Sequence, residues 1–273
     1  MDTVIGLGSA GCRIADIFAK YPQYDTFKID VGLKGERCFS MPHNHTHEEY
    51  EKNTPDMTNF LKDIEGDVLF VIGGGGNISG SSLKIMSQLK GCTLHVLYIR
   101  PALNTLNKTD FLQERVTFNI FQEYARSGIF KKLFIISNQN LEEIVGDVSI
   151  LEFNNEINKQ IVNTIHYTNI FQNTDPVLDS TEPPKDIARI CTFGIQDIKT
   201  GEEKSFFNLQ NVCDKVYFYA INESDLKSDT KLIKSIREQI SKSEIRPSYQ
   251  IHSTKHPHSF CYFISYSSRI QEG

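Results

Sequence analysis

Two glycine-rich turns in the first hundred residues each follow an apolar run and precede an amphipathic stretch. One lies in "TVIGLGSAGCRIADIFAK" at residues 3–20, and the other in "VLFVIGGGGNISGSSLKIM" at residues 68–86. Glycine packs no side chain and loses more conformational entropy on folding than other residues, so four in a row need a steric reason. Both stretches predict a strand, a tight turn and a helix, with something held close to the backbone of the turn.

The same alternation continues through the first 170 residues. Apolar runs such as "DVLFVIG", "TLHVLYIRP" and "KKLFIISN" are separated by amphipathic stretches. Strands that are apolar on both faces and separated by helices are typical of a parallel sheet covered on both sides. We therefore expect an α/β, Rossmann-like domain at residues 1–149, with a polar loop from the end of the second strand to about residue 54.

A long helix and a smaller domain are predicted beyond this point. Phe153, Ile157, Ile161 and Ile165 recur at helical spacing, which predicts a central helix at residues 150–172. The acidic, proline-rich stretch "NTDPVLDSTEPPKD" follows as the best candidate boundary. Four strand-like runs and an amphipathic stretch after it predict a mixed α/β domain at residues 173–273, with one sheet face exposed.

Composition excludes several classes of protein. The chain is 39% hydrophobic and 23% charged, which is typical of a soluble globular protein. Its net charge of −5 argues against general nucleic-acid binding. No window approaches ~18 uninterrupted apolar residues, so no membrane span is expected. Six cysteines without a C-x-x-C pair, and no signal-peptide pattern, favour reduced thiols and a cytoplasmic location.

Three histidines, His43, His45 and His47, occupy alternate positions in "MPHNHTHEEY". They could offer metal ligands if the segment were extended, but no matching His/Cys cluster follows at a zinc-like spacing. A solvated polar loop is the better interpretation, and no metal site made of protein ligands is predicted.

The first glycine turn is a complete G-x-G-x-x-G formed by Gly6, Gly8 and Gly11. Such glycines let phosphate oxygens approach the N–H groups at a helix N-terminus. Asp30 closes the next strand-like segment, where a ribose-binding acid would lie in a nicotinamide-cofactor domain. One hypothesis is therefore an NAD-dependent oxidoreductase.

The second turn, Gly73 to Gly80, favours a different ligand. It would bring a second helix N-terminus to the same edge of the sheet, which suits a polyphosphate better than the single pyrophosphate bridge of NAD. The alternative is that these glycines merely turn the chain.

At these residues the chain resembles the tubulin/FtsZ superfamily of filament-forming GTPases. "VIGLGSAGCRI" is similar to the first nucleotide loop, and "GGGGNISGSS" to the signature glycine loop of the family. "LYIRP", "LFIISNQNLEEI", "EFNNEINKQIVNTIHYTNIF" and "VYFYAINESDLKSDTKLIKSIREQI" resemble later pieces in the same order and spacing. The resemblance implies a GTPase domain, a central linking helix and an activation-type C-terminal domain, as in a divergent phage- or plasmid-type member.

The resemblance also implies site residues and ligands. GTP or GDP, with Mg²⁺, would be bound, and Asn138 would read guanine, because an amide can both donate and accept a hydrogen bond. Phe153 would pack against the base and Asn158 lies one residue from a polar base contact; the alternatives are a strand-end turn for Asn138 and helix core for Phe153. The phosphates would lie against residues of both loops: Gly8, Ser9, Ala10, Gly11, Cys12, Gly74, Gly75, Gly76, Asn77, Ser79 and Gly80.

Catalysis in this family uses acidic residues that one subunit presents to the nucleotide of the next. The best matches are Asn173 and Asp175, with Asp179 behind them and Asp186 as a rival. A carboxylate there would orient and polarise the attacking water, so hydrolysis would require head-to-tail assembly. The alternative for Asp175 is a turn-forming Asp-Pro in a linker.

Two departures from the family pattern bear on this function. Asn77 and Ile78 replace the Thr-Gly of the signature loop, and the β-branched side chain of Ile78 would crowd a phosphate. Residues 31–50 contain no match to the glycine-rich loop near the γ-phosphate. The main hypothesis is a cytoplasmic GTPase that assembles into filaments of its own copies, with a filament-binding adaptor as a candidate further partner. The alternative is a non-hydrolysing regulator or scaffold.

Overall fold

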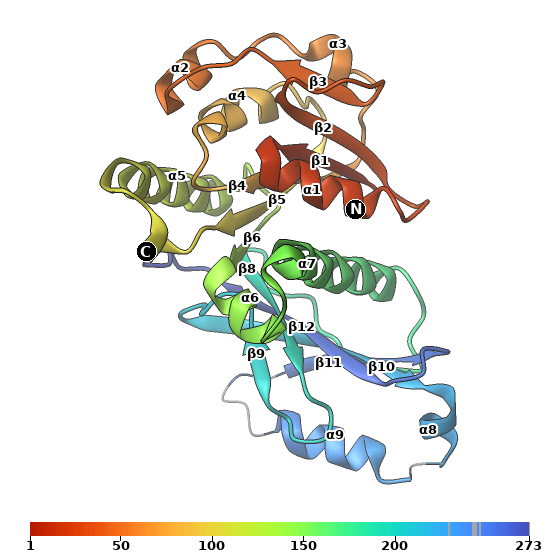
Figure 1. The fold of residues 1–273 in the computed structure, drawn as a ribbon. Helices are drawn as coiled ribbons and strands as arrows, with labels where there is room; N and C mark the ends of the chain where they lie inside the picture. Colours follow the sequence, from red (N-terminus) through yellow and green to blue (C-terminus); the bar gives the residue numbers. More distant parts are fainter. Residues whose placement is uncertain (229, 242–244, 246, 273) are drawn as a thin grey trace. The chain divides into compact units, whose positions relative to one another are not determined.

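The protein forms two compact units in a computed structural model that describes residues 1–228, 230–241, 245 and 247–272 (Figure 1). The first unit comprises residues 1–162 with residue 272, and the second comprises residues 163–271. The division falls inside the long helix α7 (Ile150–Gln172), whose bounds agree with the sequence expectation. The three-part domain division drawn from the sequence stays a prediction.

The first unit is built on a parallel sheet, as predicted. Its described strands lie in the order β3 (Cys38–Met41), β2 (Asp25–Val31), β1 (Thr3–Leu7), β4 (Asp67–Gly73), β5 (Thr93–Arg100) and β6 (Lys132–Ser137). All five residues of β1 and the middle five of β4 are buried, because helices cover both faces. The carboxyl ends of β1 and β4 therefore lie side by side at one edge.

Helices follow most of these strands. α1 (Gly8–Phe18) packs against β1, β2 and β4. The 3-10 turn η1 (Asn77–Ser81) and α4 (Ser82–Met86) follow β4, so the helix expected there is shorter and begins in a tighter turn. Further helical elements of this unit are α3 (Thr58–Leu61), η2 (Leu103–Thr105), α5 (Lys108–Ser127) and α6 (Asn138–Val145).

The polar loop expected up to residue 54 is wrong in part, because it contains β3 and the helix α2 (His47–Lys52). Thr46 Oγ1 accepts a hydrogen bond from Glu49 N at 3.1 Å, and Glu49 Oε2 accepts one from His45 N at 2.8 Å. This T-x-x-E pattern closely resembles a capping box and was the sequence signal for the helix. The four residues of β3 are too few to show a strand pattern.

The second unit is a mixed α/β domain, as predicted. Its strands lie in the order β8 (Ile190–Gln196), β12 (Phe260–Ser267), β10 (Val212–Asn222), β11 (Pro247–Thr254) and β7 (Leu178–Asp179), and β9 (Glu203–Ser205) pairs with β8. The β10–β11 pair is parallel and the other pairs are antiparallel. The described helices are α8 (Glu223–Ser228) and α9 (Leu232–Ile240).

The expectation of one exposed sheet face is wrong at β10, whose residues 216–221 are all buried. On one face, Tyr217 and Tyr219 pack with Ile236 of α9. On the other face, the Phe218 ring lies 6.4 Å from the ring of Phe171 on α7. The sequence of a strand shows its own periodicity but not which helix returns to cover it.

A histidine on β5 whose side chain is only 13% exposed predicts acid sensitivity. The Nδ1 atom of His95 has no hydrogen-bond partner in the described part of the chain, and Nε2 lies 3.7 Å from Asp67 Oδ1. Burial lowers the pKa of His95 to about 4, and outweighs the opposing effect of Asp67. The unfolded chain therefore binds more protons between about pH 6.5 and pH 4, and stability should fall by about 3 kcal/mol as the pH drops through this window.

Urea unfolding at about pH 7 and about pH 4.5 measures this effect. His95→Leu should reduce the difference between the two pH values by about 2–3 kcal/mol. His43→Leu is the control, since His43 is exposed and its removal should leave the difference unchanged. Equal pH dependence of the wild type and His95→Leu would contradict the assignment.

No described helix is long and apolar enough to cross a membrane.

Candidate nucleotide-binding site

The first glycine loop turns β1 directly into α1. Leu7 is extended, and Gly8 has a φ of 69°, in the left-handed region that favours glycine. A Cβ at Gly6 would overlap the carbonyl oxygen of Gly11, so the loop closes only because Gly6 has no side chain. No side chain caps the first turn of α1, which leaves N–H groups of that turn without an acceptor inside the helix.

The second loop contains glycines of two kinds. A Cβ at Gly74 would overlap the hydroxyl of Tyr98, and one at Gly80 would overlap the carbonyl of His47. Internal packing therefore explains these two positions. At Gly75 and Gly76, the nearest atoms to a Cβ would be Pro101 Cγ at 3.3 Å and Ile78 Cγ2 at 3.9 Å. No backbone crowds these two glycines.

A cavity of about 310 Å³ lies between the two loops and the start of α6. Arg13 is the one charged residue that lines it in the described part of the chain, and no carboxylate does so. Ile78 also lines it, as do seven of the residues predicted from the sequence: Gly8, Ser9, Ala10, Gly74, Gly75, Gly76 and Asn138.

Three helical N-termini meet this cavity without side-chain caps. The N-cap residues Leu7, Gly76 and Ser137, which precede α1, η1 and α6, make no side-chain cap hydrogen bond. Uncapped N–H groups and the positive end of a helix dipole both favour an anion. Arg13 is exposed and forms no hydrogen bond or ion pair with described residues, so its charge is available to the same anion.

Ile78 narrows the cavity, as the sequence suggested. A Cβ built at Gly8 would lie 2.7 Å from Ile78 Cγ2, so this methyl group stands over the first loop. It occupies space on the side where the N–H groups of α1 are open. The site fits a phosphate group, with less room than the glycines alone would provide.

A groove of about 420 Å³ continues from Arg13, which lines both hollows. One side of it is formed by Asp16 and Lys20 of α1, and the other by Asn154 and Asn158 of α7. Sequence reasoning missed Arg13. The available signal was its position one helical turn after Ser9 and Ala10, on the face of α1 that follows the glycine turn.

Comparison with solved structures finds the same architecture. TubZ of Bacillus thuringiensis serovar israelensis, solved as a GTPγS-form protofilament, superposes with a TM-score of 0.72 and 15% identity over 96% of this chain and 86% of its own. An empty FtsZ dimer from M. jannaschii gives a TM-score of 0.69 and 11% identity over 98% and 88%. GDP-bound CetZ1 of Haloferax volcanii gives 0.69 and 14% over 98% and 94%. This chain has the tubulin/FtsZ fold.

The resemblance noted in the sequence is therefore confirmed at the level of the fold. No protein-family model matches the chain. A search of curated proteins finds no match either.

Within this tubulin/FtsZ fold, five of the predicted phosphate residues shape the loops and do not line the cavity. A Cβ at Gly11 would lie 2.5 Å from the carbonyl oxygen of Val71, so Gly11 faces the sheet. Cys12 Sγ lies 3.5 Å from the carbonyl oxygen of Gly6, and burial raises its pKa to about 12. The others are Asn77, whose Nδ2 donates to His45 O at 2.8 Å, and the buried Ser79 and Gly80.

Two further residues predicted from the sequence lie outside the cavity. Phe153 is half-buried on α7 and lines neither the cavity nor the groove. Asp30 is at the end of β2, where its Oδ1 accepts a hydrogen bond from Val31 N at 2.8 Å, and it does not line the cavity. Asp30 is therefore not placed at this cavity to bind a ribose, as the nicotinamide-cofactor hypothesis would require.

The predicted catalytic residues all belong to the second unit. Asn173 Nδ2 donates a hydrogen bond to the carbonyl oxygen of Asn169 at 2.7 Å, at the carboxyl end of α7. Hydrogen bonds from Thr181 lower the pKa of Asp179, whose carboxylate accepts from Thr181 N and Oγ1 at 2.7 and 2.6 Å. The carboxylate of Asp175 forms no hydrogen bond or ion pair with described residues, and Asp175 is exposed. Their catalytic roles stay predictions.

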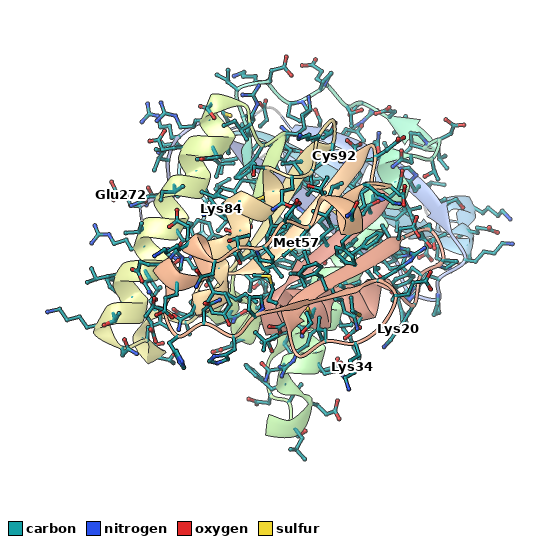
Figure 2. All side chains as sticks on the ribbon, turned by 90° about the horizontal axis from the view of Figure 1, so that it is seen from above. Lys20, Lys34, Met57, Lys84, Cys92 and Glu272 are labelled. Atoms are coloured by element: carbon teal, nitrogen blue, oxygen red, sulfur yellow. The ribbon has the colours of Figure 1, made fainter. Side chains whose placement is uncertain are left out.

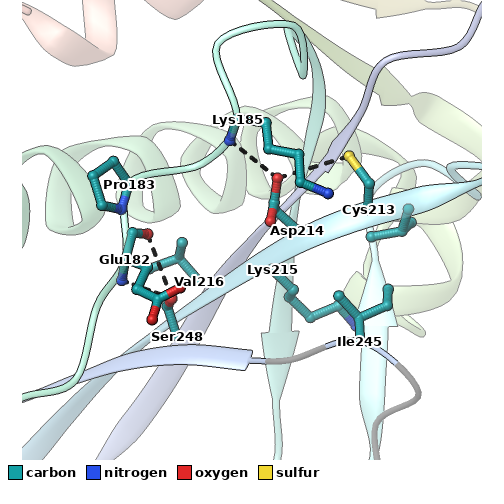
Figure 3. A pocket seen from close by; sticks show the side chains of 10 residues that line it. Glu182, Pro183, Lys185, Cys213, Asp214, Lys215, Val216, Ile245 and Ser248 are labelled. Atoms are coloured by element: carbon teal, nitrogen blue, oxygen red, sulfur yellow. Dashed lines mark hydrogen bonds between the residues drawn. The ribbon is translucent and has the colours of Figure 1, made fainter.

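A separate hollow of about 560 Å³ lies in the second unit, and Figure 3 shows the side chains that line it. Its polar atoms tie residues 182–185 to the sheet: Lys185 N donates to Asp214 Oδ2 at 3.1 Å, and Glu182 N donates to Ser248 Oγ at 2.9 Å. Burial raises the pKa of the Cys213 thiol, which therefore stays protonated. None of the predicted site residues lines this hollow.

Proposed function

We propose that this chain binds a guanine nucleotide in the cavity between its two glycine loops. The observation that carries the proposal is the convergence of three uncapped helical N-termini and the unpaired Arg13 on a cavity without a carboxylate. Such a site attracts phosphate. The solved TubZ in GTPγS and GDP forms and the GDP-bound CetZ1 share the fold and support this ligand class.

In this proposal the phosphates lie against Gly8, Ser9, Gly75 and Gly76, and Arg13 neutralises part of their charge. The base is held by the amide groups predicted for it, Asn138 at the cavity or Asn158 in the adjoining groove. No three described His, Cys, Asp or Glu side chains are grouped to hold a metal ion. Mg²⁺ would therefore be carried by the phosphates themselves, which is a common mode for this ion.

We further propose that subunits assemble head-to-tail into a cytoplasmic filament and hydrolyse GTP at their interface. TubZ and CetZ2 share the fold and were solved as protofilaments. The free, exposed carboxylate of Asp175 suits a group that acts on the nucleotide of another subunit, where it would orient the attacking water. A filament-binding adaptor remains a proposed further partner.

A second candidate is a regulator or scaffold that binds nucleotide weakly and does not hydrolyse it. The position of Ile78 over Gly8 favours this alternative, because its methyl group takes up room that a phosphate would use.

Calorimetric titration with a slowly hydrolysed GTP analogue and Mg²⁺ tests the binding proposal. Saturable binding of the GTP analogue, without binding of ATP or NADH, is the expected result. Binding of NADH alone would instead support a dinucleotide enzyme. If none of the three binds, the nucleotide proposal is wrong.

Sedimentation and phosphate release, measured with GTP, test the filament and its chemistry. Asp175→Ala should keep nucleotide binding and lose phosphate release. Asp179→Ala should lose less phosphate release than Asp175→Ala, since hydrogen bonds from Thr181 already occupy the Asp179 carboxylate. Unchanged release by Asp175→Ala would remove that residue from the proposed mechanism and make Asp186 the next candidate.

A further inference from the structure

Helix α5 exposes an apolar ridge on the side that faces away from its sheet. Leu112, Val116 and Ile120 are 52%, 56% and 39% exposed, and they follow one another at four-residue spacing. They are three of the nine large apolar side chains that the described part of the chain exposes. We call these three residues the α5 ridge. Figure 2 shows α5 along the margin of the first unit, with side chains projecting outward.

The α5 ridge is a second apolar face on one helix. The opposite face already packs into the core, where Phe118, Phe121 and Ala125 are fully buried or nearly so. A helix on the surface of a globular protein normally has one apolar stripe, with polar residues on the other side. Exposed apolar residues that are scattered singly need no explanation, but three along one row of a helix form a surface that can pack against another helix.

The ridge is self-complementary. Val116 lies at its centre, with Leu112 and Ile120 four residues away on either side. If two copies of α5 pack antiparallel about a two-fold axis at Val116, Leu112 of one copy faces Ile120 of the partner subunit. The same symmetry brings Lys108, at the start of the helix, beside Glu123 of the partner subunit, near its end.

These two charges are suited to such a contact. Lys108 forms no hydrogen bond or ion pair with described residues. Glu123 lies 3.6 Å from Arg126 of its own helix, in a pair whose side chains are both more than half exposed. An exposed pair of this kind is weak, so Glu123 can also accept a bond from a second cation. Lysine and glutamate side chains of opposite charge then lie together at both ends of the contact between the two α5 ridges.

We infer that α5 is a two-fold contact between copies of this chain, with Val116 on the symmetry axis. Three side chains from each copy bury much less than the ~1,000 Å² that a stable specific interface needs. The contact is therefore transient between free subunits. It gains strength when many copies are held in an array, because repeated weak contacts act together.

The contact does not require nucleotide, so it can be tested apart from the proposed function. The test is oxidative cross-linking of Val116→Cys without nucleotide, read as covalent dimer on a non-reducing gel. Ile129→Cys is a matched control, since Ile129 is also 56% exposed. We expect roughly fivefold more dimer from Val116→Cys, because a two-fold axis brings the same residue of both copies together. The parent chain, with six free cysteines, sets the background.

Charge exchange tests the orientation. In the Val116→Cys background, Lys108→Glu should lower the dimer yield to the level of the control, and Lys108→Glu combined with Glu123→Lys should restore it. Equal yields from Val116→Cys and Ile129→Cys would overturn the proposed contact. Failure of the combined exchange to restore the yield would overturn the antiparallel two-fold pairing. Neither result depends on whether GTP binds, which calorimetry measures separately.

Discussion

Arg100→Leu is expected to lower the free energy of unfolding by about 3–5 kcal/mol, because it leaves Glu114 as a buried carboxylate without its cation. Glu114 is fully buried, and Arg100 is 6% exposed. Arg100 Nε donates to Glu114 Oε1 at 2.9 Å, and Nη2 donates to Oε2 at 3.3 Å. Urea unfolding at neutral pH measures the loss.

A matched control and a double variant distinguish the loss of the buried ion pair from the loss of an exposed arginine. Arg126→Leu removes an arginine from the exposed pair with Glu123, and should change stability by less than about 1 kcal/mol. Arg100→Leu combined with Glu114→Leu should recover most of the stability, since no buried charge is then left unpaired. A loss below about 1 kcal/mol in Arg100→Leu would contradict the assigned role of the pair.

The same buried pair supports the second glycine loop. Tyr98 OH donates to Glu114 Oε1 at 3.3 Å, and its hydroxyl occupies the place where Gly74 would carry a Cβ. α5 is thus connected through Glu114 and Tyr98 to the backbone of the proposed phosphate site. The Arg100→Leu variant should for this reason also bind nucleotide less tightly. The loss of affinity should exceed the loss that follows from its smaller fraction of folded protein.

Ile78→Gly is expected to raise the affinity for a GTP analogue by about 10- to 100-fold, equivalent to about 1.4–2.7 kcal/mol. The substitution removes the methyl group over Gly8 and opens the first turn of α1 to a phosphate. Arg13→Gln should act in the opposite direction by about tenfold, because it removes a charge-assisted hydrogen bond to the same anion. Calorimetric titration with Mg²⁺ measures both changes.

Ile187→Gly serves as the control for Ile78→Gly. Ile187 is 65% exposed in the second unit and lines neither the cavity nor the groove, so its replacement should leave the affinity unchanged. Affinity that is equal in Ile78→Gly and the wild type would show that Ile78 does not limit the site. The alternative proposal, a regulator that binds nucleotide weakly, would then have no supporting observation.

Much of the fold could be predicted because its signals are local. The all-buried strand β4 and the helix α5, which is capped by Asn107 and ends at Gly128, carry their own periodicity and end signals. β3 and β7 are too short to carry such signals. Both faces of β10 are buried because α9 and α7 cover them. The residues of β10 itself carry no signal for this coverage.

The amino-acid sequence by itself determined the parallel α/β architecture, the two glycine turns and the crowding by Ile78. These follow from side-chain period and from where a Cβ can fit, which are properties of neighbouring residues. Only the tertiary structure decided which glycines face the cavity. Gly80 packs against His47 and lies outside the cavity, Gly74 lines the cavity but is a glycine because of Tyr98, and Gly75 and Gly76 line the cavity with no backbone crowding them. The tertiary structure also decided that Arg13 lines the cavity unpaired among the described residues and that the α5 ridge is exposed. Burial, exposure and the pairing of a charge depend on all the elements that pack around a residue.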